Sequence, residues 1–172
     1  TPRIVSIVDK PTITTLFYCC LYHYDLAENS LASPMAIRKA HRLTEKQFVW
    51  TALQARAKLK QWNDIEALFQ TKGWLGGTKM KAVVGFDRVV SVLTRLGAPR
   101  MVLNKYCKLV EPSDRRIETA KKYQCHETVL ETYMQQKDRQ SLREYQARLS
   151  PQSQEWFYAR DILNNSSIKW KN

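Results

Sequence analysis

Apolar residues recur every three or four positions along most of the chain, which is the spacing of one face of an α-helix. The first such stripe predicts a helix over residues 12–27. Its members are Ile13, Leu16, Phe17, Cys20, Leu21 and Tyr24. No stretch of four to eight residues alternates β-branched and polar side chains between turn signals. The pattern therefore predicts an all-α fold with no strand longer than a single bridge.

Capping signals divide this pattern into short helices. Ser33 followed by Pro34 predicts a short helix that runs through His41. Thr44 with Gln47 three residues later predicts a capping box and a helix to about Lys60. Further helix starts are predicted at Asn63, Phe86, Pro99, Ser113 and Asp138, and after Pro151. These signals, with two helices after Ser113, give about ten helices joined by short connections.

Short antiparallel helices pack either as a globular bundle or as a one-dimensional stack of helical pairs. Asp64 with Leu68 and Asp138 with Leu142 mark similar helix starts, a weak internal repeat that favours the stack. We therefore expect an α-solenoid of short antiparallel helical hairpins. A length of 172 residues suits one domain over residues 1–172, with a frayed tail over residues 165–172.

Four of the five glycines fall in a loop over about residues 73–85. A phosphate-binding loop would need the spacing G-x-x-x-x-G-K-[ST] after a strand, and neither is present. The loop is interpreted as a connection between helices, with Trp74 anchored on the core.

The net charge of +12 indicates an acidic partner, which could be nucleic acid, an anionic membrane surface or an acidic protein. Between Ala67 and Val110 eight basic residues stand against one acid, Asp87, so this third of the chain is a candidate electropositive face. The eight are Lys72, Lys79, Lys81, Arg88, Arg95, Arg100, Lys105 and Lys108. No apolar run approaches the ~20 residues that a membrane-spanning helix needs.

Residues for catalysis are sparse. The three histidines lie outside H-E-x-x-H, no G-x-S-x-G is present, and no acid pair suggests an acid–base couple. The four cysteines form no C-x-x-C pair, so we expect buried thiols in a reducing compartment and no zinc site. The sequence therefore predicts a non-enzymatic protein without a metal site.

A basic nucleic-acid-binding module of helical repeats is the alternative function. Basic residues with interleaved aromatic rings can neutralise phosphates and stack bases. The aromatic residues here, however, lie at core spacing, and no base-reading positions recur from repeat to repeat. We therefore do not expect nucleic acid to be the partner.

Four groups of residues carry a resemblance to a known family. They are Thr14-Thr15-Leu16-Phe17-Tyr18 through Tyr22-His23-Tyr24; Ala55-Arg56-Ala57-Lys58-Leu59 leading into Trp62-Asn63-Asp64; and Trp74-Leu75-Gly76, with Ile168-Lys169-Trp170-Lys171-Asn172 closing the chain. In their order they resemble the C-terminal domain of the B-type vacuolar protein sorting protein sixteen of animals, the VIPAR or full-of-bacteria family.

The resemblance implies an α-solenoid that binds a Sec/Munc-type protein, the B paralogue of vacuolar protein sorting protein thirty-three. It places the protein in the cytoplasm, peripherally on late endosomes and lysosomes, in endosome-to-lysosome transport and phagosome maturation. It implies neither enzymatic activity nor a cofactor, and it leaves a peripheral contact with an anionic membrane surface open.

The partner is expected to dock on the N-terminal half of the chain. By resemblance, the A paralogue uses the helix that aligns with residues 45–62, although it carries a basic residue where this chain has Gln47. A basic cluster beside a tryptophan is also typical of an interface hot spot. Alternatively, Trp50 packs within the fold and the basic cluster is only solvated. The predicted contact residues are Arg38, Lys39, His41, Arg42, Gln47, Trp50, Thr51, Gln54 and Lys58.

Overall fold

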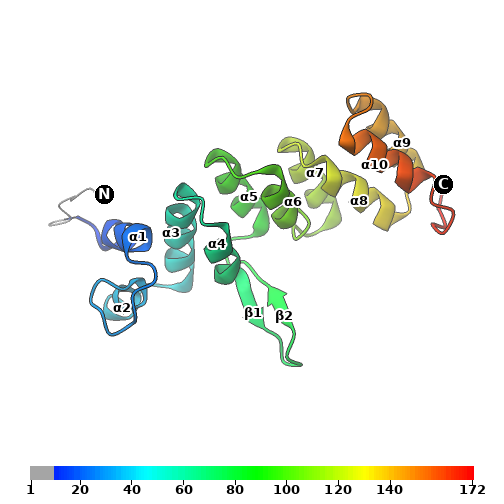
Figure 1. The fold of residues 1–172 in the computed structure, drawn as a ribbon. Coiled ribbons are helices and arrows are strands. Elements are labelled where there is room, and N and C mark those ends of the chain that lie inside the picture. The colour runs from blue at the N-terminus through cyan, green and yellow to red at the C-terminus, as the bar shows by residue number, and fades with distance from the viewer. Residues whose placement is uncertain (1–9) are drawn as a thin grey trace. The chain divides into compact units, whose positions relative to one another are not determined.

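The computed structural model describes residues 10–172, and this part of the chain is all-α apart from one small hairpin (Figure 1). The chain divides into two compact units. Unit 1 comprises residues 1–85 and 95–98, and unit 2 comprises residues 86–94 and 99–172. The prediction of a single domain over residues 1–172 stays a prediction.

Unit 1 holds four helices and the hairpin. The helices are α1 (Thr12–Tyr22), α2 (Pro34–Ala40), α3 (Glu45–Lys58) and α4 (Trp62–Phe69), and the strands are β1 (Gln70–Lys72) and β2 (Thr78–Met80). Helix α3 packs against both α1 and α4, and α2 packs against α1. Leu16, Leu53, Ile65 and Phe69 are fully buried and form the centre of this core.

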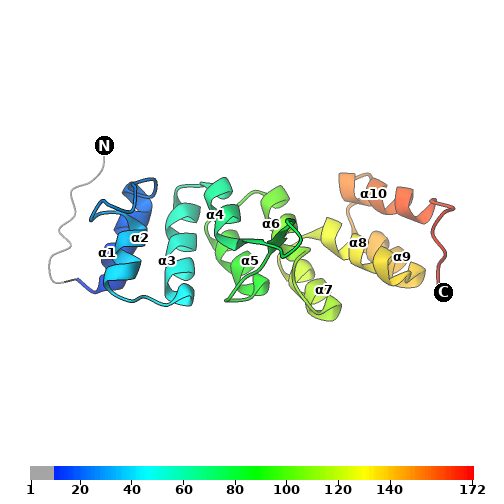
Figure 2. The same ribbon diagram turned by 90° about the horizontal axis from the view of Figure 1, so that it is seen from below.

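Unit 2 begins with α5 (Phe86–Arg95), whose last residue falls in unit 1. It continues with α6 (Arg100–Cys107), α7 (Ser113–Lys122), α8 (His126–Gln136), α9 (Arg139–Arg148) and α10 (Gln154–Leu163). From α6 onward each helix packs on the next, and α8 also contacts α6 and α10 (Figures 1 and 2). Packing of this kind, between first and second neighbours, is that expected of stacked helical hairpins.

The side-chain caps of three helices confirm the sequence prediction. The Ser33 Oγ accepts from Ala36 N–H at 3.5 Å, and Thr44 and Gln47 form the full capping box. The Asp138 carboxylate accepts from Ser141 N–H at 3.0 Å. Helices α4 and α7 begin at Trp62 and Ser113, within one residue of the predicted starts. The N-caps expected from Asn63 and Ser113 are wrong, because Gln61 and Pro112 take the N-cap positions and neither helix has a side-chain cap.

Four helices end on a left-handed residue that is not glycine. Arg42, Lys60, Gln124 and Lys137 follow or cap α2, α3, α7 and α8 with φ between 50° and 58°. In each case the next N–H bonds the carbonyl five residues back, as in Leu43 to Arg38 and Gln61 to Arg56. This is the Schellman motif, which usually places glycine at that position.

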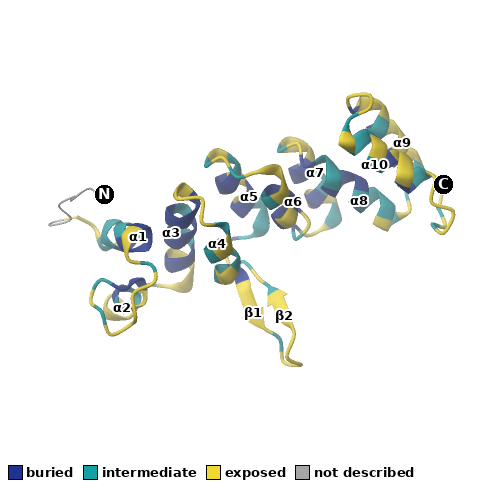
Figure 3. Cartoon of the chain, viewed as in Figure 1, coloured by how far each residue is buried: buried dark blue, intermediate teal, exposed yellow. Residues whose placement is uncertain are grey.

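The hairpin contradicts two expectations. Strands β1 and β2 pair antiparallel, Thr71 opposite Lys79, so the chain does contain strands longer than a bridge. Trp74 is 99% exposed at the hairpin tip instead of anchored on the core. Figure 3 shows the strands as almost entirely exposed, whereas the helices of the same unit carry the buried positions.

The structure adds detail at the first helix and at the C-terminal tail. Helix α1 ends at Tyr22 rather than near residue 27. The tail predicted to fray is hydrogen bonded to the start of α9, because Asn172 Oδ1 accepts from Arg139 N–H at 2.7 Å and Lys171 N–H donates to the Lys137 carbonyl at 2.9 Å.

Candidate partner-binding surface

The nine predicted contact residues lie on α2, on the turn after it and on α3, all within unit 1. We call this region the α2–α3 surface. The structure brings eight of the nine to the exposed or half-buried side of these helices, namely Arg38, Lys39, His41, Arg42, Gln47, Trp50, Gln54 and Lys58. Thr51 is only 5% exposed, because it lies on the packed side of α3.

The α2 part of this surface is basic. The Arg38 guanidinium lies 5.0 Å from the centre of the Phe48 ring, a cation–π contact that joins α2 to α3. Lys39 forms an ion pair with Glu28, which removes it from the free positive charge. His41 and Arg42 are exposed beyond the last turn of α2.

The α3 part is a stripe along one side of the helix. Gln47, Trp50, Gln54 and Lys58 follow one another at intervals of three or four residues, which places them above one another. Trp50 and Gln54 are half-buried, and Gln54 Oε1 accepts from Arg95 Nη2 at 3.5 Å. Trp50 thus presents part of its ring among polar neighbours.

Gln47 already has a structural role. Its Oε1 accepts from Thr44 N–H at 2.9 Å, and its own N–H donates to Thr44 Oγ1 at 3.2 Å. A side chain that is used in a capping box is not free to bind a partner without uncapping α3.

A buried arginine holds the helices behind this surface. Arg56 Nη1 donates to the carbonyls of Cys20 at 2.9 Å and Leu21 at 3.2 Å, and Nη2 donates to Asp64 Oδ2 at 2.8 Å. Its guanidinium also lies 4.6 Å from the centre of the Tyr24 ring. Burial, and after it the Asp64 carboxylate, raises the pKa of Tyr24 to about 12. Arg56 thereby ties the end of α1 and the start of α4 to α3.

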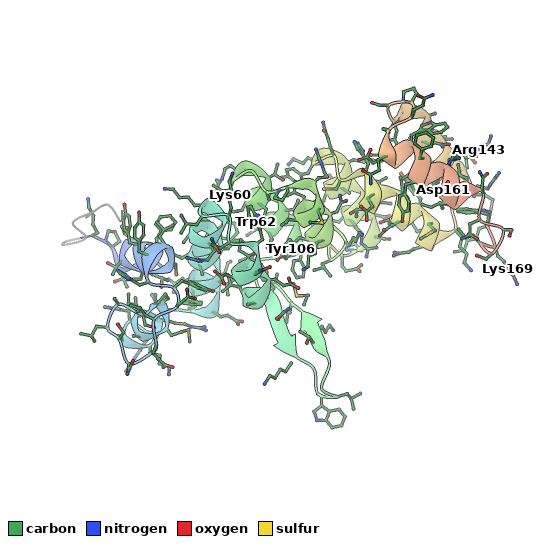
Figure 4. All side chains as sticks on the ribbon, in the orientation of Figure 1. Lys60, Trp62, Tyr106, Arg143, Asp161 and Lys169 are labelled. Carbon is green, nitrogen blue, oxygen red and sulfur yellow. The ribbon has the colours of Figure 1, made fainter. Side chains whose placement is uncertain are left out.

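Two further cations border the surface and were missed by the sequence analysis. Lys46 is exposed in the first turn of α3. Lys60 is exposed beyond the end of α3, directly after its C-cap residue Leu59. Figure 4 shows Lys60 and Trp62 where α3 passes into α4. Lys46, adjacent to Gln47, could have been found by marking every exposed position of the predicted helix.

The central basic residues do not form one free face of one unit. Lys72, Lys79 and Lys81 lie in unit 1, whereas Arg100 and Lys108 lie in unit 2 and serve its fold. Arg100 Nη1 donates to the carbonyls of Tyr123 at 2.6 Å and Gln124 at 2.8 Å, which end α7. Lys108 pairs with Glu127 at 2.7 Å and Glu131 at 3.2 Å.

The described residues include no group of three or more His, Cys, Asp or Glu side chains that could hold a metal ion. His126 Nδ1 lies 2.6 Å from Tyr145 Oη, and burial lowers the pKa of His126. The four cysteines are free and buried. In residues 10–172 no helix is both long and apolar enough to cross a membrane.

Comparison with known proteins finds relatives over nearly the whole chain. The chain is 46% identical over 171 residues to the spermatogenesis-defective protein 39 homolog of Danio rerio, covering 99% of this chain and 35% of that protein. The homolog of Bos taurus is equally similar, with 36% of its length covered. Spermatogenesis-defective protein 39 of Caenorhabditis elegans is 27% identical over 186 residues. No family model and no solved structure matches.

These relatives correct the family assignment made from the sequence motifs. The assignment to the B-type vacuolar protein sorting protein sixteen is wrong, because the relatives carry the name spermatogenesis-defective protein 39. The chain spans only 35–36% of the length of the vertebrate relatives cited above. Over nearly all its residues the chain is thus similar to one stretch of spermatogenesis-defective protein 39.

Proposed function

We propose that this chain is a non-enzymatic scaffold that holds a partner protein on the α2–α3 surface. The observation that carries the proposal is the half-buried Trp50 on α3, with the exposed Lys46 four residues before it on the same side of the helix. Arg42 before the helix and Lys58 at its end are also exposed, and none of these three cations forms an ion pair among the described residues. Tryptophan and arginine are the residues that interface hot spots favour. The rigid backing by Arg56 fixes the helices that present these side chains.

The partner is a protein with an acidic surface, and the candidate is a Sec/Munc-type protein, the B paralogue of vacuolar protein sorting protein thirty-three. The net charge of +12 supports an acidic surface on the partner opposite the α2–α3 surface. The complex would act peripherally on late endosomes and lysosomes, in endosome-to-lysosome transport and phagosome maturation.

The test is capture of the candidate partner by charge-reversal variants. Arg42→Glu with Lys58→Glu should weaken binding about tenfold or more at low salt, because like charges then face the acidic surface. Both side chains are exposed, so the helical content should be kept. The melting temperature should fall only slightly, because the variant loses a cation at the C-terminal ends of α2 and α3 and the contact of Lys58 with the Phe17 ring. Trp50→Ala should weaken binding by ~2 kcal/mol or more, as hot-spot truncations do.

Arg143→Glu with Lys169→Glu in unit 2 is the matched control, since it reverses two exposed charges that do not belong to the α2–α3 surface. Equal binding by the Arg42/Lys58 variant and the unmodified chain would refute the dock. Retention of the chain on single-stranded RNA at physiological salt, with no capture of the protein, would favour the nucleic-acid function instead.

A further inference from the structure

The β1–β2 hairpin ends in a tightly built turn. Gly73 N–H donates to the Gly77 carbonyl at 2.6 Å, and Gly76 N–H donates to the Gly73 carbonyl at 3.0 Å. Gly76 has φ of +83°, a left-handed conformation that closes hairpin loops of this length. A Cβ atom on Gly73 would lie 2.9 Å from the Gly77 carbonyl oxygen, so the turn also needs glycine there. Trp74 and Leu75 occupy the two corner positions of this turn.

The two corner side chains contact almost nothing. Trp74 is 99% exposed and Leu75 is 92% exposed, whereas the other four tryptophans of the chain are half-buried. The hairpin leaves the helices of unit 1 at the end of α4 and extends away from them (Figures 1 and 4). The packing of unit 1 therefore gives no reason for a tryptophan and a leucine at this tip.

The charge behind the tip has one sign. Lys72, Lys79 and Lys81 are exposed, and no acid occurs between residues 70 and 85. None of the three lysines forms an ion pair with a residue that the structure describes. Lys72 lies two residues before Trp74, about 7 Å behind it at the rise of a β-strand.

We propose that this hairpin is a peripheral membrane anchor whose tip enters an anionic lipid bilayer. Tryptophan prefers the membrane–water interface, and an apolar side chain next to it adds buried area. Lys72 and Lys79 stand at the depth of the headgroups when the tip is buried ~5–10 Å, where they pair with lipid phosphates and carboxylates. Lys81, whose N–H donates to the Phe69 carbonyl at the base of the hairpin, stands farther from the tip and adds a longer-range attraction.

The order of the residues favours lipid over the other acidic partners. Single-stranded nucleic acid would use the Trp74 ring for stacking, yet Leu75 offers no surface for a base. In a bilayer both corner residues are used, and the cations fall behind them. This anchor does not rest on the α2–α3 surface, which can bind or fail to bind its protein partner independently.

The test is sedimentation of the chain with vesicles of phosphatidylcholine, with and without phosphatidylserine. The unmodified chain should sediment with the vesicles that contain phosphatidylserine and stay in the supernatant with those of phosphatidylcholine alone. Trp74→Ala with Leu75→Ser should reduce binding at least tenfold. Lys72→Gln and Lys79→Gln should each reduce it about fivefold, and a triple variant that adds Lys81→Gln should bind more weakly still. Arg115→Gln, Arg143→Gln and Lys169→Gln together remove as many charges as the triple variant from exposed positions of unit 2 and serve as its control.

A second measurement places the tip itself. Leu75→Cys can be labelled with an environment-sensitive fluorophore, because the four native thiols are buried. Its emission should shift to the blue on anionic vesicles, and a label at Ser166→Cys should not shift. Unchanged vesicle binding by the tip variant, or equal loss in the control, would overturn the proposal. Loss of RNA or partner binding by the tip variant without loss of vesicle binding would overturn it as well.

Discussion

Arg56 shows how much one residue can join. Its spacing predicts a place on the inner side of its helix, because it lies seven residues after Val49 and three after Leu53. The structure shows why an arginine is tolerated there, since its donors meet two carbonyls and one carboxylate. Burying a charge is affordable only when its hydrogen bonds are satisfied in this way.

Arg56→Lys should lower the free energy of unfolding by about 2 kcal/mol, because lysine lacks the planar fork that reaches Cys20, Leu21 and Asp64 at once. The midpoint of urea unfolding measures this loss. Arg143→Lys is the control, because Arg143 is exposed, and it should change the midpoint little. Equal midpoints for the two variants would contradict the role given to Arg56.

At the same scale, the sequence predicted some caps and missed others for a physical reason. Ser33 and Asp138 cap as predicted. The Asp138 carboxylate keeps its cap although its Oδ1 also accepts from Asn172 Nδ2 at 2.8 Å, because a carboxylate oxygen accepts more than one hydrogen bond. Ser113 does not cap α7, because it is the first residue of the helix and Pro112 takes the N-cap position. Its Oγ accepts instead from Gln136 Nε2 at 3.2 Å, a partner 23 residues away that local spacing cannot reveal.

At the scale of elements, side chains of α6 form hydrogen bonds with the end of α7 and the start of α8. Cys125 gives α8 no side-chain cap, and Asn104 Oδ1 on α6 accepts from Thr128 N–H at 3.2 Å and from Thr128 Oγ1 at 2.8 Å. Arg100, one turn earlier, donates to the carbonyls that end α7. Helix α6 therefore fixes the turn between α7 and α8.

Asn104→Ala should destabilise the fold by about 1–2 kcal/mol, the usual cost of losing a helix N-cap. Asn104→Asp should recover part of the loss, because a carboxylate oxygen still accepts from Thr128 and is favoured at a helix start. Hydrogen exchange of the first amides of α8 would report the change locally. Equal exchange in all three proteins would show that Asn104 does not cap α8.

The hairpin is the element that sequence reading missed. Its strands have three residues each and are exposed on both faces, so no alternation of apolar and polar residues announces them. The usable signal was the spacing of Gly73, Gly76 and Gly77, which fits a short hairpin loop closed by a left-handed glycine. Strands without a buried face have to be recognised from their turns.

At the scale of the whole molecule, the helical periodicity was sufficient to predict the fold class. Buried residues lie four positions apart within a helix, as Val49 and Leu53 do in α3 and Val89 and Leu93 do in α5. This spacing made the number and order of the helices predictable. The candidate surface was readable only in outline, since neither the burial of Thr51 nor the pairing of Lys39 with Glu28 has a local sequence signal.

The four cysteines report on the integrity of the whole chain. All are buried, and burial raises the pKa of Cys20 to about 12, with the charge of Cys19 as a second cause. The hydrogen bond with Cys107 lowers the pKa of Cys125, so for that thiol it is burial that keeps a reagent away. A disulfide reagent at pH 8 should therefore react with almost no thiol in the native protein and with four in urea. Rapid reaction of even one thiol without denaturant would contradict this.

The Schellman motifs that end α2, α3, α7 and α8 mostly place a charged residue at the left-handed position. A glycine would fit the left-handed backbone better, by about 1 kcal/mol, but three of the four positions hold Arg42, Lys60 and Lys137. A cation there also offsets the negative end of the helix dipole. Thermostabilisation by glycine is therefore free of other consequences only at Gln124. At Arg42 and Lys60 a change to glycine would relieve the strain of the left-handed backbone, but it would also remove a positive charge from the edge of the α2–α3 surface. A variant with both changes would therefore bind an acidic partner more weakly although its fold is more stable.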